Sequence, residues 1–303
     1  MDILVTGGTG FIGSSVVRAL IKKGHLVTIL TRSADKAKSP PEGVRFVKGD
    51  PTRPGSWQDE ITKQQGIINL AGASIFRKWS KAAKRMILES RLTTTQNIVN
   101  ALVKMGKNQI HLLNASAVGY YGFCGDDVLD EKSPGGEDFL ATVSSRWEQT
   151  ALEAERLGTR VVLCRAGIVL GKGGGALVQL RKIFEGYLGA QLGSGEQWIS
   201  WIHLEDLTRI FCFLLENANL SGPVNCTSPH PVRNREFTQT LAQKLGKPLL
   251  LPRVPGFMLK LALGEFAKTL IHGQRVKPQK LLESGFEFSY PSLGGALNNL
   301  LNK

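Results

Sequence analysis

Cysteine is scarce in this chain, and no two cysteines are closely spaced. The four among its 303 residues are scattered, with no C-x-x-C pair: Cys124, Cys164, Cys212 and Cys226. This pattern argues against a disulfide framework and a zinc site, and it is typical of a protein from a reducing compartment. The expected location is therefore cytoplasmic, and no metal site is expected.

Long hydrophobic runs and a recognisable leader are also missing. No apolar stretch reaches the roughly 20 residues that a membrane-spanning helix needs. The first residues already have the pattern of a buried strand and not that of a cleavable signal. We therefore expect no membrane partner.

Acidic residues are too few to balance the basic ones. The chain has 38 Lys and Arg against 25 Asp and Glu, a formal net charge of +13. Such a charge attracts nucleic acid, an acidic membrane surface or phosphorylated ligands. The basic residues are spread along the chain, however, and no nucleic-acid-binding signature accompanies them. The expected partner is a small-molecule substrate and not nucleic acid, and the expected assembly is a monomer or homodimer.

A glycine motif stands in a strand, turn and helix context at the start of the chain. Residues 3–5 predict a short buried strand, the turn reads G-G-T-G-F-I-G, and an amphipathic segment follows it. In a dinucleotide-binding turn, Gly7 permits the tight bend, Gly10 lets the backbone approach a pyrophosphate, and Gly13 lets helix and strand pack closely. The alternative is a plain glycine turn, but this context favours a nucleotide at the helix N-terminus.

The end of the second predicted strand, over residues 25–30, bears on which nucleotide is bound. Thr31 and Arg32 follow this strand. An NAD-selective fold usually places Asp or Glu here to hold the ribose 2′-hydroxyl, whereas a guanidinium can bind a 2′-phosphate. Arg32 therefore favours NADP; the alternative is a surface arginine in a loop.

Further strands and helices alternate along the chain. Strands are predicted over residues 44–48, 66–73, 109–114 and 159–165, and a helix over residues 79–105. This alternation predicts an α/β fold with a doubly wound parallel sheet of the Rossmann type, whose ligands bind at the carboxyl ends of the strands. Asp50 follows the third strand, where it either reaches the adenine or stabilises the turn.

Several motifs carry a family resemblance that spans nearly the whole chain. They are G-G-T-G-F-I-G at 7–13, G-D at 49–50, N-L-A-G at 69–72, S-R-L-T-T-T at 90–95, S-A-V-G-Y-Y-G at 116–122, G-K-G-G-G-A-L at 171–177, W-I-H-L-E-D at 201–206, G-Q-R-V-K-P-Q at 273–279 and G-F-E-F-S-Y-P at 285–291. With them the chain resembles the extended short-chain dehydrogenases/reductases. Within that superfamily it resembles an atypical branch labelled as NAD(P)-dependent epimerase-family proteins.

The resemblance implies an NADP(H) cofactor held by the glycine loop and by residues after several strands. These residues are Gly7, Thr9, Gly10, Phe11, Ile12, Gly13, Thr31, Arg32, Asp50, Leu70, Ala71, Gly72, Arg91 and Val169. Arg91 reaches a phosphate in this interpretation; the alternative is an ordinary arginine on a helix surface.

The usual catalytic groups of the superfamily are only partly present. A typical member uses a Ser together with a Y-x-x-x-K pair, whose Lys lowers the pKa of the Tyr. Ser116 matches the Ser, but Leu140 and Ser144 occupy the Tyr and Lys positions. Because a tyrosine without such help is a poor base at neutral pH, the usual mechanism is in doubt.

Two neighbouring tyrosines are candidate substitutes for the missing pair. Tyr120 and Tyr121 follow Ser116 closely, and Arg146 is a candidate for the missing positive charge. The alternative is that both tyrosines only pack at the end of the fifth strand. Two functions stay open: an NADP-dependent oxidoreductase or epimerase-like enzyme on an unknown carbonyl or hydroxyl substrate, such as a nucleotide sugar, or a non-catalytic NADPH-binding sensor or regulatory protein.

The resemblance also implies two domains. Residues 1–171, joined again by 200–226, form the NADP-binding domain, and residues 172–199 and 227–303 form a smaller, mostly helical substrate lobe. Helices are expected in this lobe over residues 176–192, 235–245 and 257–271. The last is apolar with few charges, so we expect it in the core or at an interface and not on a membrane surface.

Overall fold

The computed structural model describes residues 1–33, 40–106 and 109–302. In chain order its elements are β1 (Asp2–Thr6), α1 (Phe11–Lys22), β2 (Leu26–Thr31), β3 (Val44–Lys48), η2 (Ser56–Lys63), β4 (Gly66–Asn69), α2 (Lys81–Met105), β5 (His111–Ala117), η3 (Val118–Tyr121), β6 (Val128–Leu129), α3 (Phe139–Leu152), η4 (Glu153–Leu157), β7 (Arg160–Ala166), β8 (Ile168–Gly171), α4 (Gly175–Glu185), β9 (Trp198–Ile199), β10 (Trp201–His203), α5 (Leu204–Glu216), β11 (Gly222–Cys226), β12 (Val232–Arg233), α6 (Asn234–Leu245), α7 (Gly256–Leu263), η5 (Gly264–Ala267), α8 (Lys268–Ile271), β13 (Arg275–Val276), α9 (Gln279–Glu283) and α10 (Leu293–Leu301).

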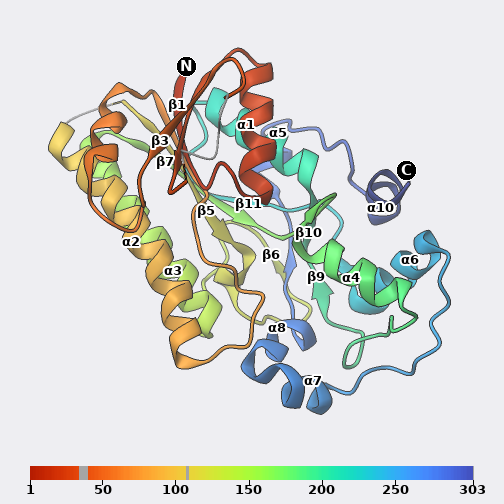
Figure 1. Cartoon of the computed structure of the whole chain (residues 1–303). Helices are drawn as coiled ribbons and strands as arrows, with labels where there is room; N and C mark the ends of the chain where they lie inside the picture. The colour runs from red at the N-terminus through yellow and green to blue at the C-terminus, as the bar shows by residue number, and fades with distance from the viewer. Residues whose placement is uncertain (34–39, 107–108, 303) are drawn as a thin grey trace.

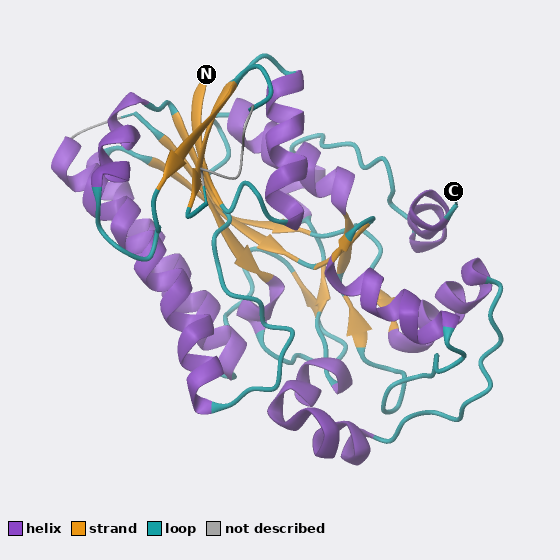
Figure 2. Ribbon diagram, viewed as in Figure 1, coloured by secondary structure: helices purple, strands orange, loops and turns teal. Residues whose placement is uncertain are grey.

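A seven-stranded parallel sheet forms the centre of the molecule (Figures 1 and 2). Its strand order is β11-β7-β5-β4-β1-β2-β3. The order reverses direction between β1 and β4, and such a switch point opens a crevice at the carboxyl ends of the strands. The fold class predicted from the sequence, a doubly wound parallel sheet with a helical C-terminal part, is confirmed.

Helices cover both faces of this sheet, which is why its strands are apolar on both sides. Along β1, Ile3 and Val5 face the layer of α1 and α5, and Leu4 faces the layer of α2 and η2. All three side chains are fully buried. Burial of both faces produces the continuous apolar runs from which the sequence predicted the strands.

The second lobe has a core of its own, built from α4, α6 and α10. Leu177, Phe237 and Leu297 pack there with Trp201. The C-terminal segment also returns to the main sheet, where Leu281 joins the core of the α1 and α5 layer. The division of the chain at residues 171 and 226 stays a prediction.

The W-I-H-L-E-D motif fastens this returning segment. The carboxylate of Asp206, at the start of α5, accepts hydrogen bonds from the backbone of Ser289 (2.8 Å) and Tyr290 (2.9 Å). His203 caps α5 by accepting from the backbone N–H of Glu205 (3.0 Å), and its ring stacks on Tyr290. The role of this motif is therefore structural.

Two helix predictions in the second lobe were too long. Helix α4 ends at Glu185, because Gly186 follows and Tyr187 adopts a left-handed backbone with φ of 60°. The helix expected over 257–271 is divided at Gly264, which has φ of +63°. Among the described residues, no helix is both long and apolar enough to cross a bilayer.

Candidate functional site

The glycine turn brings the end of β1 into contact with the end of β4. Gly7 has φ of +69°, and a Cβ added to it would lie 2.8 Å from the carbonyl carbon of Leu70. A Cβ on Gly13 would lie 2.1 Å from the carbonyl oxygen of Gly7. Side chains at these two positions would overlap backbone atoms, so the turn itself requires both glycines. Their contact with a nucleotide stays a prediction.

Helix α1 begins at this turn with an open N-terminus. Gly10 is its N-cap residue and has no side chain, so no side-chain acceptor caps the helix within the described chain. Amide N–H groups at such an end attract phosphate. The ring of Phe11, the first residue of α1, lies against Gly174. A Cβ added to Gly174 would lie 2.4 Å from this ring. The glycine-rich segment after β8 therefore packs over Phe11.

Arg32 and Asp50 lie near each other after β2 and β3. The Asp50 carboxylate accepts from the backbone N–H (2.9 Å) and the hydroxyl (2.7 Å) of Thr52. Burial raises the pKa of Asp50, but the bonds from Thr52 and the charges of Arg32 and Arg53 outweigh it and lower the pKa overall. Asp50 thus stabilises the turn, which was one of its two expected roles. Arg32 is exposed at the rim.

Arg91 holds the small-residue turn that follows β4. Its guanidinium donates to the carbonyl oxygens of Ala73 (3.0 Å) and Ile87 (2.9 Å) and lies 5.1 Å from the ring centre of Trp147. A Cβ on Gly72 would come within 3.2 Å of this guanidinium. Burial lowers the pKa of Arg91 to about 10. Arg91 is therefore a packed residue of the turn and not an ordinary surface arginine.

A ladder of buried polar side chains aligns the strand ends around the crevice. Thr6 of β1 donates to Asn69 of β4 (2.6 Å), and Asn69 donates to Asn114 of β5 (2.7 Å). Asn69 also donates to Thr95 of α2, which accepts from Trp147 of α3. Since buried polar groups must be paired, this ladder fixes the register of the three strands.

Ser116, at the end of β5, belongs to a closed and buried charge network. Its hydroxyl donates to the Glu148 carboxylate of α3 (2.6 Å). Arg165 of β7 binds the same carboxylate through two nitrogens, at 2.8 and 2.7 Å. The three residues are between 3% and 5% exposed. The Ser116 hydroxyl is thus held by a carboxylate that is itself paired with Arg165.

The two candidate tyrosines lie against this network in different ways. Tyr121 is 1% exposed, donates to Asn225 (2.7 Å) and accepts from Arg165 (3.0 Å). Burial raises the pKa of Tyr121 to about 12, which makes it a poor proton donor or acceptor. The ring of Tyr120 packs 3.5 Å from the Arg165 guanidinium. Arg146 is exposed, so the positive charge beside Ser116 comes from Arg165.

The sequence did not identify Glu148 and Arg165 as functional residues. Arg165 follows the apolar residues 161–164 of β7, and a charge next to such a buried run indicates a buried ion pair. Its partner lies on α3 and is not marked by any spacing. The positions of the missing pair are filled by Leu140 and Ser144, which pack against Gly119 of η3.

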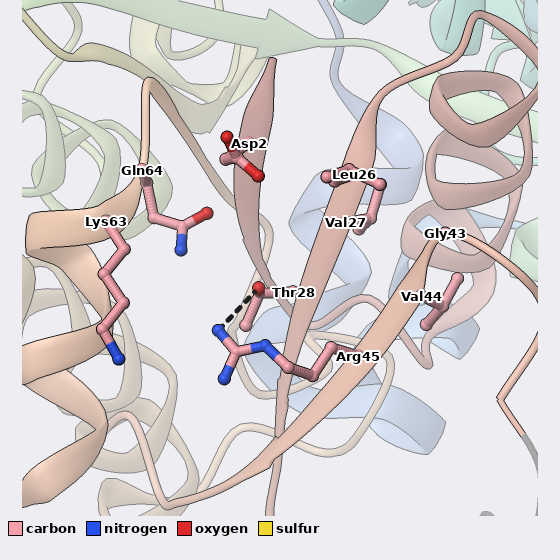
Figure 3. A pocket seen from close by; sticks show the side chains of 9 residues that line it. All are labelled: Asp2, Leu26, Val27, Thr28, Gly43, Val44, Arg45, Lys63 and Gln64. Atoms are coloured by element: carbon pink, nitrogen blue, oxygen red, sulfur yellow. Dashed lines mark hydrogen bonds between the residues drawn. The ribbon is translucent and has the colours of Figure 1, made fainter.

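Two hollows lie away from the glycine turn. Figure 3 shows the first, about 360 Å³, where Arg45 donates to Thr28 at the amino ends of β1, β2 and β3, on the opposite edge of the sheet. The second, about 340 Å³, is lined in part by Phe123, Trp198 and Arg233. Within the part of the chain that the structure describes, no group of three His, Cys, Asp or Glu side chains is arranged to hold a metal ion.

Comparisons with known proteins agree with this geometry. Residues 3–226 match the model of the NAD dependent epimerase/dehydratase family, and residues 254–300 match a domain of unknown function, DUF1731. The chain is 40% identical over 304 residues to the "Epimerase family protein SDR39U1 homolog, chloroplastic" of Arabidopsis thaliana, covering 99% of this chain and 87% of that protein. It is 37% identical to the epimerase family protein YfhF of Bacillus subtilis, covering 99% and 98%.

Solved structures show the same arrangement. The crystal structure of human epimerase family protein SDR39U1 (isoform2) with NADPH is 33% identical and matches with a TM-score of 0.85, over 100% of both chains. The UDP-glucose 4-epimerase of Thermus thermophilus in complex with NAD is 20% identical with a TM-score of 0.78, which supports the fold alone; the match covers 100% of this chain and 98% of that one. From its sequence, its fold and these relatives, the chain belongs to the NAD dependent epimerase/dehydratase family.

Proposed function

We propose that this chain binds NADPH in the crevice at the ends of β1, β2 and β4, and acts as an oxidoreductase or epimerase-like enzyme. The substrate would carry a carbonyl or hydroxyl group. The observation that carries this proposal is the cradle of Gly7 and Gly13 beside the open N-terminus of α1. The human relative that matches over the whole chain was crystallised with NADPH, which supports the same ligand.

The residues at the crevice fit this nucleotide. A pyrophosphate needs backbone N–H groups without a side chain in the way, and the turn through Gly10 supplies them. Arg32 is exposed beside the end of β2, where a 2′-phosphate would need a cation. When bound, the nicotinamide supplies a reversible two-electron reduction. Ser116 and its network fix the end of β5, which is the neighbour of β4 in the sheet.

The variant Arg32→Ala should bind NADPH more weakly and NADH unchanged. Loss of a charged contact to the 2′-phosphate should cost about 1.5–3 kcal/mol, roughly tenfold or more in affinity. Calorimetric titration of both nucleotides measures this effect. Arg53→Ala is the matched control, since Arg53 also acts on Asp50. Equal losses in both variants, or an equal loss for NADH, would show that Arg32 does not select the 2′-phosphate.

A second candidate function is a non-catalytic NADPH-binding sensor. The observation that favours it is the replacement of the Tyr–Lys pair by Leu140 and Ser144, together with the hydrogen bond that the Ser116 hydroxyl donates to Glu148. In such a protein the same crevice would bind NADPH, and a partner protein would recognise the NADPH-bound form.

Turnover distinguishes the two functions. We expect oxidation of NADPH with at least one member of a panel of carbonyl compounds and nucleotide sugars, and loss of this activity in Ser116→Ala. Ser144→Ala is the control, because Ser144 is an equally buried serine nearby. NADPH affinity and Tm show whether either variant is merely misfolded. Tight NADPH binding without turnover on the whole panel would favour the sensor.

A further inference from the structure

Helix α7 lies on the surface with its large apolar side chains uncovered. None of the eight described residues of this helix is buried. Phe257, Met258 and Leu261 are 71%, 51% and 85% exposed. Figure 1 shows α7 at the lower edge of the view, outside the helices that cover the sheet. A contiguous apolar patch of this kind usually marks an interaction site.

The fold holds α7 in this position from both ends. Before the helix, the backbone of Val254 donates to Gln191 (2.8 Å) and accepts from Gly193 (2.9 Å). After it, the ring of Phe266 packs edge-on against Trp79, with ring centres 5.6 Å apart. The exposed helix is therefore an anchored part of the structure, and its apolar face is presented at a fixed place.

The segment 257–271 was expected in the core or at an interface, and Phe266 and Ala267 after α7 are indeed buried. Helix α7 itself is not in the core, which leaves for it an interface or a membrane surface. The charges around α7 distinguish these two. Arg253, Lys260 and Lys268 are exposed, and the single acidic residue of segment 250–271, Glu265, is paired with Lys84. A two-fold contact between copies through α7 would bring like charges together. A surface of anionic lipids instead accepts both the apolar and the basic side chains.

We propose that α7 docks this chain on a membrane surface that contains anionic lipids. Phe257 and Leu261 enter the interface between headgroups and acyl chains, and Arg253 and Lys260 lie among the phosphates. Because a single short helix buries little apolar area, attachment is reversible and depends on the lipid charge. This membrane docking does not depend on the proposed function, since α7 supplies no residue to the glycine turn or the Ser116 network.

Flotation of the full chain with vesicles tests this docking. We expect binding to vesicles of phosphatidylcholine with about one-third phosphatidylglycerol, and little binding to phosphatidylcholine alone. The double variant Phe257→Ser/Leu261→Ser should lower binding by at least about tenfold, because both side chains are lost from the interface. Lys260→Glu and added salt should each weaken binding.

Matched controls separate this effect from general changes in the protein. Leu26→Ser alters another leucine that is 58% exposed, at the opposite end of the sheet, and should bind vesicles normally. Lys22→Glu changes the net charge by the same amount as Lys260→Glu, and it should lower vesicle binding less than Lys260→Glu does. All variants should keep the Tm of the unchanged protein, which shows that they are folded.

Two results would overturn the proposal. One is equal or absent binding to the two kinds of vesicle. The other is that the full chain forms a dimer in analytical ultracentrifugation and the Phe257→Ser/Leu261→Ser variant is a monomer. The apolar face of α7 would then be a dimer interface.

Discussion

Replacing Gly13 by alanine should abolish NADPH binding and strongly destabilise the protein. The new Cβ would lie 2.1 Å from the carbonyl oxygen of Gly7 and 2.8 Å from the Cα of Gly8, and these backbone atoms leave it no space. Helix α1 would have to move away from β1, which would open the phosphate cradle. We expect a loss of about 3 kcal/mol or more and a fall in Tm of roughly 6 °C or more. Calorimetry with NADPH and thermal unfolding measure the two effects.

Gly294→Ala is the control for this experiment. Gly294 lies in α10, and an added Cβ would meet no atom within 4 Å. Alanine is also the better helix former, so this variant should be neutral or slightly more stable. A Gly13→Ala protein that keeps its NADPH affinity would show that the glycine turn is not the nucleotide site.

The second large effect is expected from Arg165→Met. This change leaves the buried Glu148 carboxylate without its cation, and breaking a buried ion pair from one side costs about 3–5 kcal/mol. It also removes a hydrogen bond to Tyr121 and the packing against Tyr120. Urea unfolding measures the loss of stability.

Two further variants make this result specific. The double variant Arg165→Met/Glu148→Met should be less destabilised than the single one, because no unpaired charge stays buried. Arg181→Met removes an exposed pair with Glu185 on α4 and should change stability by only about 0.5 kcal/mol or less. If Arg165→Met proved no worse than Arg181→Met, the network would not be important for stability.

Most of the sheet could be predicted from the sequence because its inner strands are buried on both faces, whereas the edge strand β3 has no fully buried residue. Short continuous apolar runs such as residues 3–5 and 161–164 are typical of buried strands. The glycines of the first turn could be predicted for a related reason, since backbone contacts at Gly7 and Gly13 exclude any other residue. The glycine motif is local in the sequence, although the contact that requires Gly7 is with Leu70, far along the chain.

Features that depend on contacts between distant segments could not be predicted in this way. Glu148 and Arg165 become a pair only after α3 has packed on the sheet. The apolar pattern of residues 257–271 is the same for a buried and an exposed helix, so it could not show that α7 is uncovered. The division of the segment 257–271 at Gly264 depends on a backbone φ of +63°, which glycine permits but does not require.

The packing of the C-terminal segment has a consequence for the order in which the chain folds during synthesis. Leu281 and Phe286 share one core with Ile3, although nearly the whole sequence lies between them. The core between the sheet and the layer of α1 and α5 is therefore incomplete until this late segment has been synthesised. Such long-range closure is slow and leaves apolar surface exposed in the growing chain. We therefore expect this half of the sheet to reach its final stability only after residues 281–286 have been synthesised.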